Sequence, residues 1–428
     1  MVNPLTFVAT AVLAYALLSK RLASTAITAP IFFATAGFVA GPVLGVVDLA
    51  MDQELVILLL EAALVMVLFA DASSLDIRRW TKEPSLSGRL LGIGLPLTMA
   101  AGAAAALVLF GGIEPWQAGL VGVMLAPTDA ALGQAVVANP RVPAVIRNAL
   151  NVESGLNDGL ALPFVTILVT VGLVAGGAET ELHGAEVLIV ALGGSTLIGL
   201  ISGLGGGWLL RVAAERGLAA ERWQSVGLIA LAVGTFTVAD QVEASGFLAV
   251  WVAGLAAGTV VRGHVAGDAF HLPEQAANGL AAIGFLLLGA GLAPVLARAT
   301  PEAVLYAVLS LTIVRMLPVA IAMLRTGFAV PTLLYVGWFG PRGLASIVFA
   351  GVVVAQAVPA AREMTDVVLL TVAISLVAHG VTAAWGARRY AAWFERAATV
   401  DAAIPEAAEL PDDGLYHRGG SRRGVQVV

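Results

Sequence analysis

The sequence predicts an all-α polytopic membrane protein, and three observations carry that prediction. Hydrophobic residues make up 59% of the chain and charged residues only 12%, whereas a soluble chain carries about 25% charge. The mean hydropathy is +0.92, and the apolar residues fall in long unbroken runs. This composition excludes an ordinary soluble enzyme and a disordered protein. The net charge of −6 offers no basic surface for nucleic acid, and the absence of cysteine excludes disulfides and zinc-thiolate sites.

The apolar runs predict about thirteen transmembrane helices, because roughly 20 apolar residues cross a hydrocarbon layer of about 30 Å. Barrel strands would instead alternate in hydropathy over about 10 residues. The first run has no clear small-residue cleavage site and another span follows it, so we interpret it as an anchor. The expected spans cover 4–19, 27–47, 53–72, 89–111, 116–138, 147–175, 185–210, 223–242, 246–262, 275–296, 302–324, 330–356 and 364–386.

The charges in the loops predict the orientation of the chain. Arginine and lysine gather after odd-numbered spans, for example Arg78, Arg79 and Arg216, and acids such as Asp48 and Glu179 gather after even-numbered spans. Basic loops stay in the cytoplasm. We therefore expect an odd number of spans in the cell (inner or plasma) membrane, with the N-terminus outside and the C-terminus in the cytoplasm.

Two sequence echoes predict an internal repeat within a transmembrane domain of residues 1–395, followed by a short, disordered cytoplasmic tail at 396–428. Gly37-Phe-Val-Ala40 matches Gly246-Phe-Leu-Ala249, and the proline-containing segment 126–129 corresponds to 340–343. Both offsets are seven spans, which would invert one half relative to the other, as repeats of about 4–175 and 223–386. Inverted repeats with broken helices at the midplane are typical of secondary transporters, and a mid-span proline favours such a break. Coincidence is the alternative, because mid-helix prolines are common in membrane proteins.

The densest polar patch in any span is Asn151–Gly159. Ser154 and Asp158 share one helix face, and Glu153 and Asn157 share the neighbouring face. Hydroxyl, amide and carboxylate oxygens are hard ligands, which suit a proton or a small hard cation better than a transition metal. An ionised, unpaired Asp158 in lipid is costly, so this carboxylate should always hold either a proton or a cation. A structural carboxylate in a salt bridge is the alternative for Asp158.

Other ionisable residues inside spans have alternative interpretations. Asp129 follows Pro127 and Thr128 and could either cap free backbone amides or bind an ion. Glu61 could act directly or pair with a basic residue such as Arg315. We interpret His379 as a packed histidine rather than a pH sensor.

Four motifs together resemble the sodium/proton exchanger family, in particular its monovalent cation:proton antiporter-1 branch. The resemblance covers about residues 5–395, and its most specific part is the Glu-Ser-Gly-x-Asn-Asp-Gly run. The motifs are Ala126-Pro-Thr-Asp129, Arg147, Glu153-Ser-Gly-Leu-Asn-Asp-Gly159 and Gly340-Pro-Arg-Gly-Leu344.

The resemblance implies the sodium/proton antiporter fold and a homodimer whose protomers each have a dimerisation domain and a mobile core domain. It implies that Asp158 binds cation and proton in turn. Thr128, Asp129 (mainly through its backbone), Ser154 and, more weakly, Asp71 would complete the ion site, with Asp158, Ser154 and Thr128 as the ligands of the monovalent cation. It further implies that Glu153 pairs with Arg342. Electrogenic relatives carry a second aspartate at position 157, where this chain has Asn157.

The expected function is therefore exchange of a monovalent cation, sodium first, for protons, electroneutral at one to one. The expected partners are the cation, the proton, the lipid bilayer and a second copy of the chain, without a cofactor or nucleic acid. Potassium/proton exchange is the alternative, because no motif decides the cation. A membrane-embedded hydrolase lacks a G-x-S-x-G elbow here, and a channel lacks a repeated filter loop.

Overall fold

The computed structural model describes residues 3–22, 25, 27–45, 54–75, 86–129, 132, 139–177, 189–400 and 404–408. The described part of the chain is built from helices joined by turns and short extended segments. These helices are α1 (Pro4–Leu22), α2 (Ala29–Phe38) with a π-helical turn (Val39–Val43), α3 (Glu54–Ser74), α5 (Leu86–Arg89), a π-helical turn (Leu90–Gly94), α6 (Leu95–Leu109), α7 (Pro115–Met124), α9 (Ala144–Ala175), a π-helical turn (Ile189–Gly194), α11 (Ser195–Glu215), α12 (Glu221–Gln241), α13 (Gly246–Val261), α14 (His271–Ala290), α15 (Leu292–Ala297), α16 (Pro301–Leu311), α17 (Ile313–Ala322), α18 (Val330–Trp338), α19 (Leu344–Ala355), α20 (Ala361–Val400) and a 3₁₀ turn (Pro405–Ala407).

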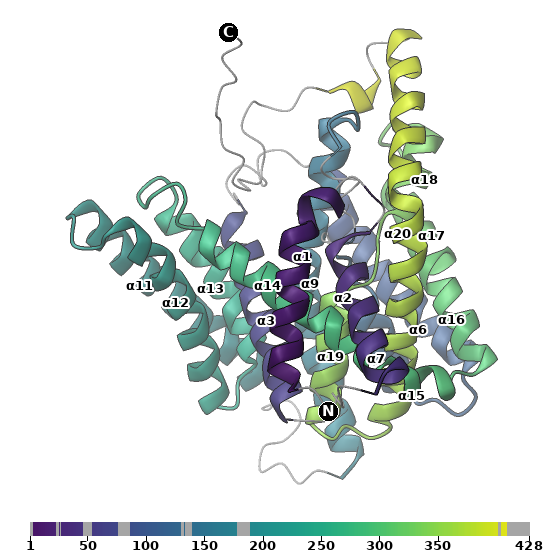
Figure 1. The fold of residues 1–428 in the computed structure, drawn as a ribbon, viewed down its shortest axis with the longest axis horizontal. Helices are drawn as coiled ribbons and strands as arrows, with labels where there is room; N and C mark the ends of the chain where they lie inside the picture. Colours follow the sequence, from purple (N-terminus) through teal and green to yellow (C-terminus); the bar gives the residue numbers. More distant parts are fainter. Residues whose placement is uncertain are drawn as a thin grey trace.

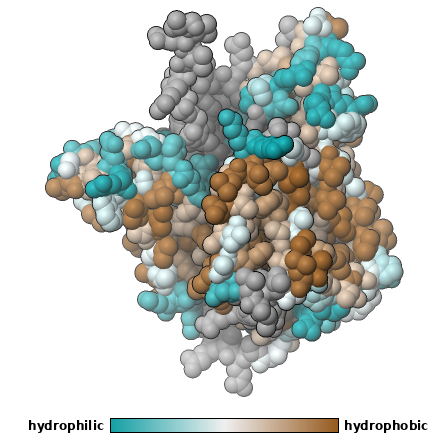
Figure 2. All heavy atoms as spheres, viewed as in Figure 1, coloured by the Kyte–Doolittle hydropathy of each residue, from teal (hydrophilic) through white to brown (hydrophobic). Residues whose placement is uncertain are grey.

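Every span expected from the sequence overlaps a helix, or two consecutive helical segments, among the described residues. Eight described helices are long and apolar enough to cross a membrane, and three shorter apolar helices accompany them. Hydrophobic side chains gather around the middle of the molecule and hydrophilic ones at its upper and lower ends (Figure 2). The chain is therefore a multi-pass membrane protein. The number of crossings and the inverted repeat stay predictions.

The helices form two groups, which we name by their architecture. The scaffold comprises α1, α2, α3, α11, α12, α13 and α14, and the broken-helix bundle comprises α6, α7, α9 and α16 to α20. In Figure 1, α11, α12 and α13 lie on the left and α6, α16, α17, α18 and α20 on the right. The groups meet where α3, α13 and α14 pack against α9 and α19.

The scaffold is held together by close approach of small residues. Gly199, Gly203 and Gly207 recur every four residues along one face of α11, which packs against α13. A Cβ atom on Gly203 would lie 2.5 Å from the carbonyl oxygen of Ala253. Because lipid offers no hydrophobic drive between helices, such small-residue faces are a main source of packing energy in membranes.

In the bundle, two helices end at proline-containing segments, where the sequence predicts breaks. Helix α7 ends at Met124, and α18 ends at Trp338 before an extended segment that leads to α19 at Leu344. Pro127 and Pro341 lie in these segments. The break at Pro341 is thereby confirmed, with a helix on each side of it; at Pro127 the end of α7 agrees with the prediction, and the remainder of the expected span 116–138 lies mostly outside the described residues.

The expected disordered tail requires a correction at its start. Helix α20 continues to Val400, and residues 404–408 are packed, with Glu406 only 2% exposed. The Glu406 Oε1 atom accepts hydrogen bonds from the backbone N–H of Ala329 (2.8 Å) and the hydroxyl of Thr332 (2.6 Å) at the start of α18. The rest of the predicted tail lies outside the described residues.

The far end of α20 is also tied to the start of α9. Arg141 donates to Glu395 at 2.9 Å, and this hydrogen bond holds the pKa of Glu395 below its usual value. The start of α1 and the end of α20 lie at opposite ends of the molecule (Figure 1).

Candidate functional site: a carboxylate cavity at two crossing helix breaks

The two breaks touch each other through hydrogen bonds. The N–H of Asp129 donates to the carbonyl of Pro341 at 2.8 Å, and the N–H of Leu344 donates to Oδ2 of Asp129 at 2.9 Å. The Asp129 carboxylate therefore caps the positive N-terminal end of α19. Asp129 thus has the capping role that the sequence left open, and its side chain also lines the cavity described below.

Arg342 neutralises the opposite helix end. Its Nη1 donates to the carbonyl of Ala126 at 2.6 Å and approaches that of Pro127 at 3.3 Å, just beyond the C-terminal end of α7. A cation is favourable there, because the unpaired carbonyls of a helix end carry partial negative charge. In lipid no water can satisfy these groups, so Arg342 makes the break possible.

The expected ion pair between Glu153 and Arg342 is wrong. Glu153 pairs instead with Arg315 of α17, with 2.6 Å between Oε1 and Nη1 and both side chains at most 2% exposed. Arg315 is therefore not a partner of Glu61 either. The physical reason is that the guanidinium of Arg342 is occupied by carbonyl oxygens of the first break, which leaves Arg315 to meet the carboxylate on α9.

The polar face of α9 holds the first break in place. The Ser154 hydroxyl donates to the carbonyl of Thr128 at 2.7 Å, and the Asn157 amide donates to the Thr128 hydroxyl at 2.7 Å. Because the Ser154 hydroxyl donates its hydrogen to a carbonyl, the lone pairs of its oxygen remain available to coordinate a cation. Asn157 is therefore an organising residue of this site.

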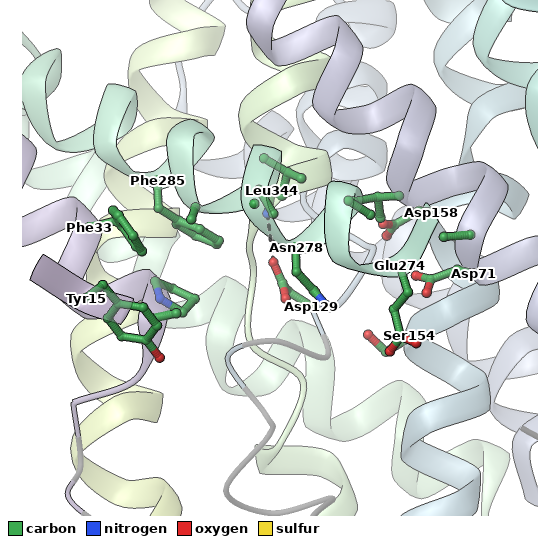
Figure 3. A pocket seen from close by; sticks show the side chains of 18 of the residues that line it. Tyr15, Phe33, Asp71, Asp129, Ser154, Asp158, Glu274, Asn278, Phe285 and Leu344 are labelled. Carbon is green, nitrogen blue, oxygen red and sulfur yellow. Dashed lines mark hydrogen bonds between the residues drawn. The ribbon is translucent and has the colours of Figure 1, made fainter. Parts of the chain in front are cut away.

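A cavity of about 590 Å³ opens between the two groups of helices. Its polar lining includes Thr128, Asp129, Ser154 and Asp158 from the bundle and Asp71 from α3. Asp158 is half-buried, and among the described residues it has no hydrogen-bond or ion-pair partner; Asp129 and Asp71 are among its charged neighbours. Figure 3 shows Asp71 and Asp158 close together and Asp129 further along the same cavity.

The structure thus brings together every residue that the sequence analysis placed in the ion site. Glu61 does not line the cavity. His379 is buried; its Nε2 lies 2.9 Å from the carbonyl oxygen of Trp338, and its Nδ1 lies 3.1 Å from the hydroxyl of Ser375, a pair of contacts that a neutral, packed histidine satisfies with one donor and one acceptor.

Sequence reasoning missed Glu274 and Asn278, two lining residues on α14. Both belong to the first two turns of their helix, next to a polar connection. The signal that could have found them is their spacing of four residues, which puts both on one helix face.

Comparison with curated proteins finds two kinds of cation/proton antiporter. The K(+)/H(+) antiporter NhaP of Alkalimonas amylolytica is 28% identical over 80% of this chain and 58% of its own length. The Na(+)/H(+) antiporter NhaS2 of Synechocystis sp. is 26% identical over 77% of this chain and 61% of its own length. The chain spans about three fifths of the length of these relatives.

Comparison with solved structures agrees on the fold. The sodium proton antiporter MjNhaP1 from Methanocaldococcus jannaschii superposes with a TM-score of 0.72 at 19% identity, and the match covers 90% of this chain and 98% of that one. The model of the family "Sodium/hydrogen exchanger, transmembrane" matches residues 8–389. The chain therefore belongs to the transmembrane sodium/hydrogen exchanger family.

Proposed function

We propose that this chain is a secondary active transporter, not an enzyme, and that it exchanges a monovalent cation for protons by alternating access. The observation that carries the proposal is which charged side chains of the bundle have a partner and which do not. Asp129 caps α19, Glu153 is paired with Arg315, and Arg342 holds backbone carbonyls. Asp158 is the carboxylate that these arrangements leave open to the cavity.

The chemistry at Asp158 follows from the cost of an uncompensated charge away from water. Moving the site across the membrane costs little free energy when the Asp158 carboxylate is protonated or has a cation bound. It costs much more when the carboxylate is ionised and has no cation. A cation that binds the carboxylate with the oxygens of Ser154 and Thr128 must therefore displace the proton. Loading that alternates in this way is exchange.

The proposed stoichiometry is one cation for one proton. Asn157 cannot titrate, and it already donates to Thr128, so it supports the site without adding a proton. With Asp158 as the titrating group, the loaded site has the same charge in both directions and the exchange is electroneutral.

Sodium is the first candidate for the cation and potassium the second. Two of the relatives reported above differ in this respect by name, one being a K(+)/H(+) and the other a Na(+)/H(+) antiporter. Carboxylate and hydroxyl oxygens serve both ions. Parallel transport measurements with sodium and potassium will decide between them.

The proposed setting is a homodimer in the cell membrane, with the N-terminus outside and the C-terminus in the cytoplasm. The loop charges and the opposite positions of the start of α1 and the end of α20 (Figure 1) support this orientation. A reporter fused to the C-terminus should be active in the cytoplasm, and activity outside the cell would overturn the orientation.

The test is exchange by proteoliposomes that contain a pH-sensitive dye. A sodium or potassium pulse should move protons in the wild type, and Asp158→Asn should abolish this movement while the purified protein keeps its thermal stability. Asp240→Asn is the matched control, because Asp240 lies in the last turn of α12 and does not line the cavity. Substantial exchange by Asp158→Asn would remove this residue from the mechanism. Cation flux without proton movement would favour a channel.

A further inference from the structure

Helix α14 presents a polar face to the cavity. Glu274 and Asn278 both line it, four residues apart on one side of the helix. Figure 3 shows Glu274 beside Asp71, Asp158 and Ser154, and Asn278 next to Asp129. Glu274 is half-buried and Asn278 is exposed. Because Asp158 and Glu274 both line this cavity, the two carboxylates face one space.

Helix α14 belongs firmly to the scaffold. A Cβ atom on Gly37 of α2 would overlap the carbonyl oxygen of Leu286, and one on Gly289 would overlap that of Ala34. These glycines let the backbones of α2 and α14 touch, so the two helices form one unit. Glu274 is therefore carried by the scaffold, whereas Asp158 is carried by the bundle.

We propose that Glu274, with Asn278 beside it, receives the cation at the mouth of the cavity, sets its apparent affinity, and is not the group that exchanges the proton. This inference rests on the proposed exchange at Asp158 and adds a selectivity and entry residue to it. A carboxylate and an amide oxygen are hard ligands that can replace part of the water shell of a monovalent cation. An acid on the wall of a cleft also raises the local concentration of cations.

A purely structural role for Glu274 makes a different prediction. The residue lies in the first turn of α14, where a negative side chain stabilises the helix dipole. A cap of this kind would change thermal stability and leave the cation dependence of transport unchanged. A receiving role changes the cation concentration at half-maximal rate, KM, and leaves stability and maximal rate in place.

The test is the cation dependence of exchange for Glu274→Gln in proteoliposomes, measured with sodium and potassium. We expect KM to rise about threefold to tenfold, a magnitude at the lower end of electrostatic focusing in clefts, with the maximal rate within about twofold of wild type. The rise should shrink at high ionic strength, where screening weakens the field. Asn278→Ala should raise KM less, and Glu274→Asp should restore most of the affinity.

Asp268→Asn is the matched control, because it removes the same charge from the exposed segment just before α14, outside the cavity lining. Its KM should equal that of the wild type. An unchanged KM in Glu274→Gln, a loss of maximal rate without a change in KM, or an equal effect of Asp268→Asn would each overturn the proposal. These outcomes leave the proposed function intact as long as the wild type exchanges cations for protons and Asp158→Asn does not. Absence of exchange in the wild type would instead refute the proposed function itself.

Discussion

The scaffold and the broken-helix bundle are stabilised in different ways. In the scaffold, helices touch through glycine, alanine and serine, as where Gly258 of α13 meets Ser73 of α3. In the bundle, fully buried charged side chains stand between the helices, with Glu153 on Arg315 and Arg342 on backbone carbonyls. Among the described residues of the two groups, the fully buried charged side chains lie in the bundle, whereas the scaffold carries Asp71 and Glu274 on the wall of the cavity.

The difference follows from the continuity of the helices. An intact helix satisfies its own backbone groups, so the scaffold can pack with apolar surfaces alone. A broken helix leaves free carbonyls and amides, and the bundle supplies Arg342 and Asp129 to satisfy them. The same breaks create the polar space in which Asp158 faces a cation. The cost of breaking two helices is thus linked to the formation of a site.

The largest stability effect that we expect comes from separating the buried ion pair. Glu153→Ala and Arg315→Ala should each destabilise the protein by about 3–5 kcal/mol, because each leaves a buried charge without its partner. The double variant should lose less than the sum of the two. Thermal unfolding in detergent, analysed as a double-mutant cycle, measures this coupling.

A second double-mutant cycle tests whether Arg342 also pairs with Glu153. Glu153→Ala combined with Arg342→Ala should show much weaker coupling, because Arg342 donates to the carbonyls of Ala126 and Pro127. Stronger coupling of Glu153 to Arg342 than to Arg315 would refute the assignment.

A smaller effect is expected from one added methyl group in the scaffold. Gly203→Ala should destabilise by about 1–3 kcal/mol through overpacking, because its Cβ would press on the backbone of Ala253. Gly205→Ala on the same helix is the control, since no atom lies within 4 Å of its Cβ position, and it should be neutral or slightly stabilising. Equal stability of the two variants would contradict the close packing of α11 on α13.

An effect of similar size concerns the segment after α20. Glu406→Ala should lower stability by about 1–3 kcal/mol, because it leaves the Ala329 N–H without its acceptor and removes one of the two hydrogen-bond partners of the Thr332 hydroxyl. Glu406→Gln keeps a carbonyl oxygen in place and should lose less. If Glu406→Ala unfolds at the same temperature as the wild type, this segment does not hold the start of α18.

The sequence was sufficient to predict the helices and the two proline-containing segments at which α7 and α18 end. In lipid, every backbone N–H and C=O group needs a partner within the protein, so a long apolar run forms a helix. Pro127 and Pro341 in the middle of such runs indicate interruptions. It could not predict the packing of Glu406, because a polar segment after the last span gives no periodic signal. The number of crossings stays a prediction.

Prediction of the site was partial for reasons of geometry. Thr128, Asp129, Ser154 and Asp158 lie in compact motifs, and the family resemblance that these motifs carry implied that they form one site. The choice between Arg315 and Arg342 as partner of Glu153 depends on how two crossing segments rotate, which no spacing encodes. Glu274 was missed because an acid in a first turn is typical of an ordinary helix start.

The central claim is that one carboxylate, Asp158, exchanges one proton for one monovalent cation. A field of 100 mV acts on each net charge moved with about 2.3 kcal/mol, which is more than tenfold in an equilibrium constant. The most direct test is the cation-to-proton balance point of proteoliposomes at several membrane potentials, set by a gradient of the permeant anion thiocyanate so that potassium can also be tested. We predict that the balance point does not move with voltage. A shift would contradict the claim and would mean that a second group, with Asp71 and Glu274 the first candidates in the cavity, carries another proton.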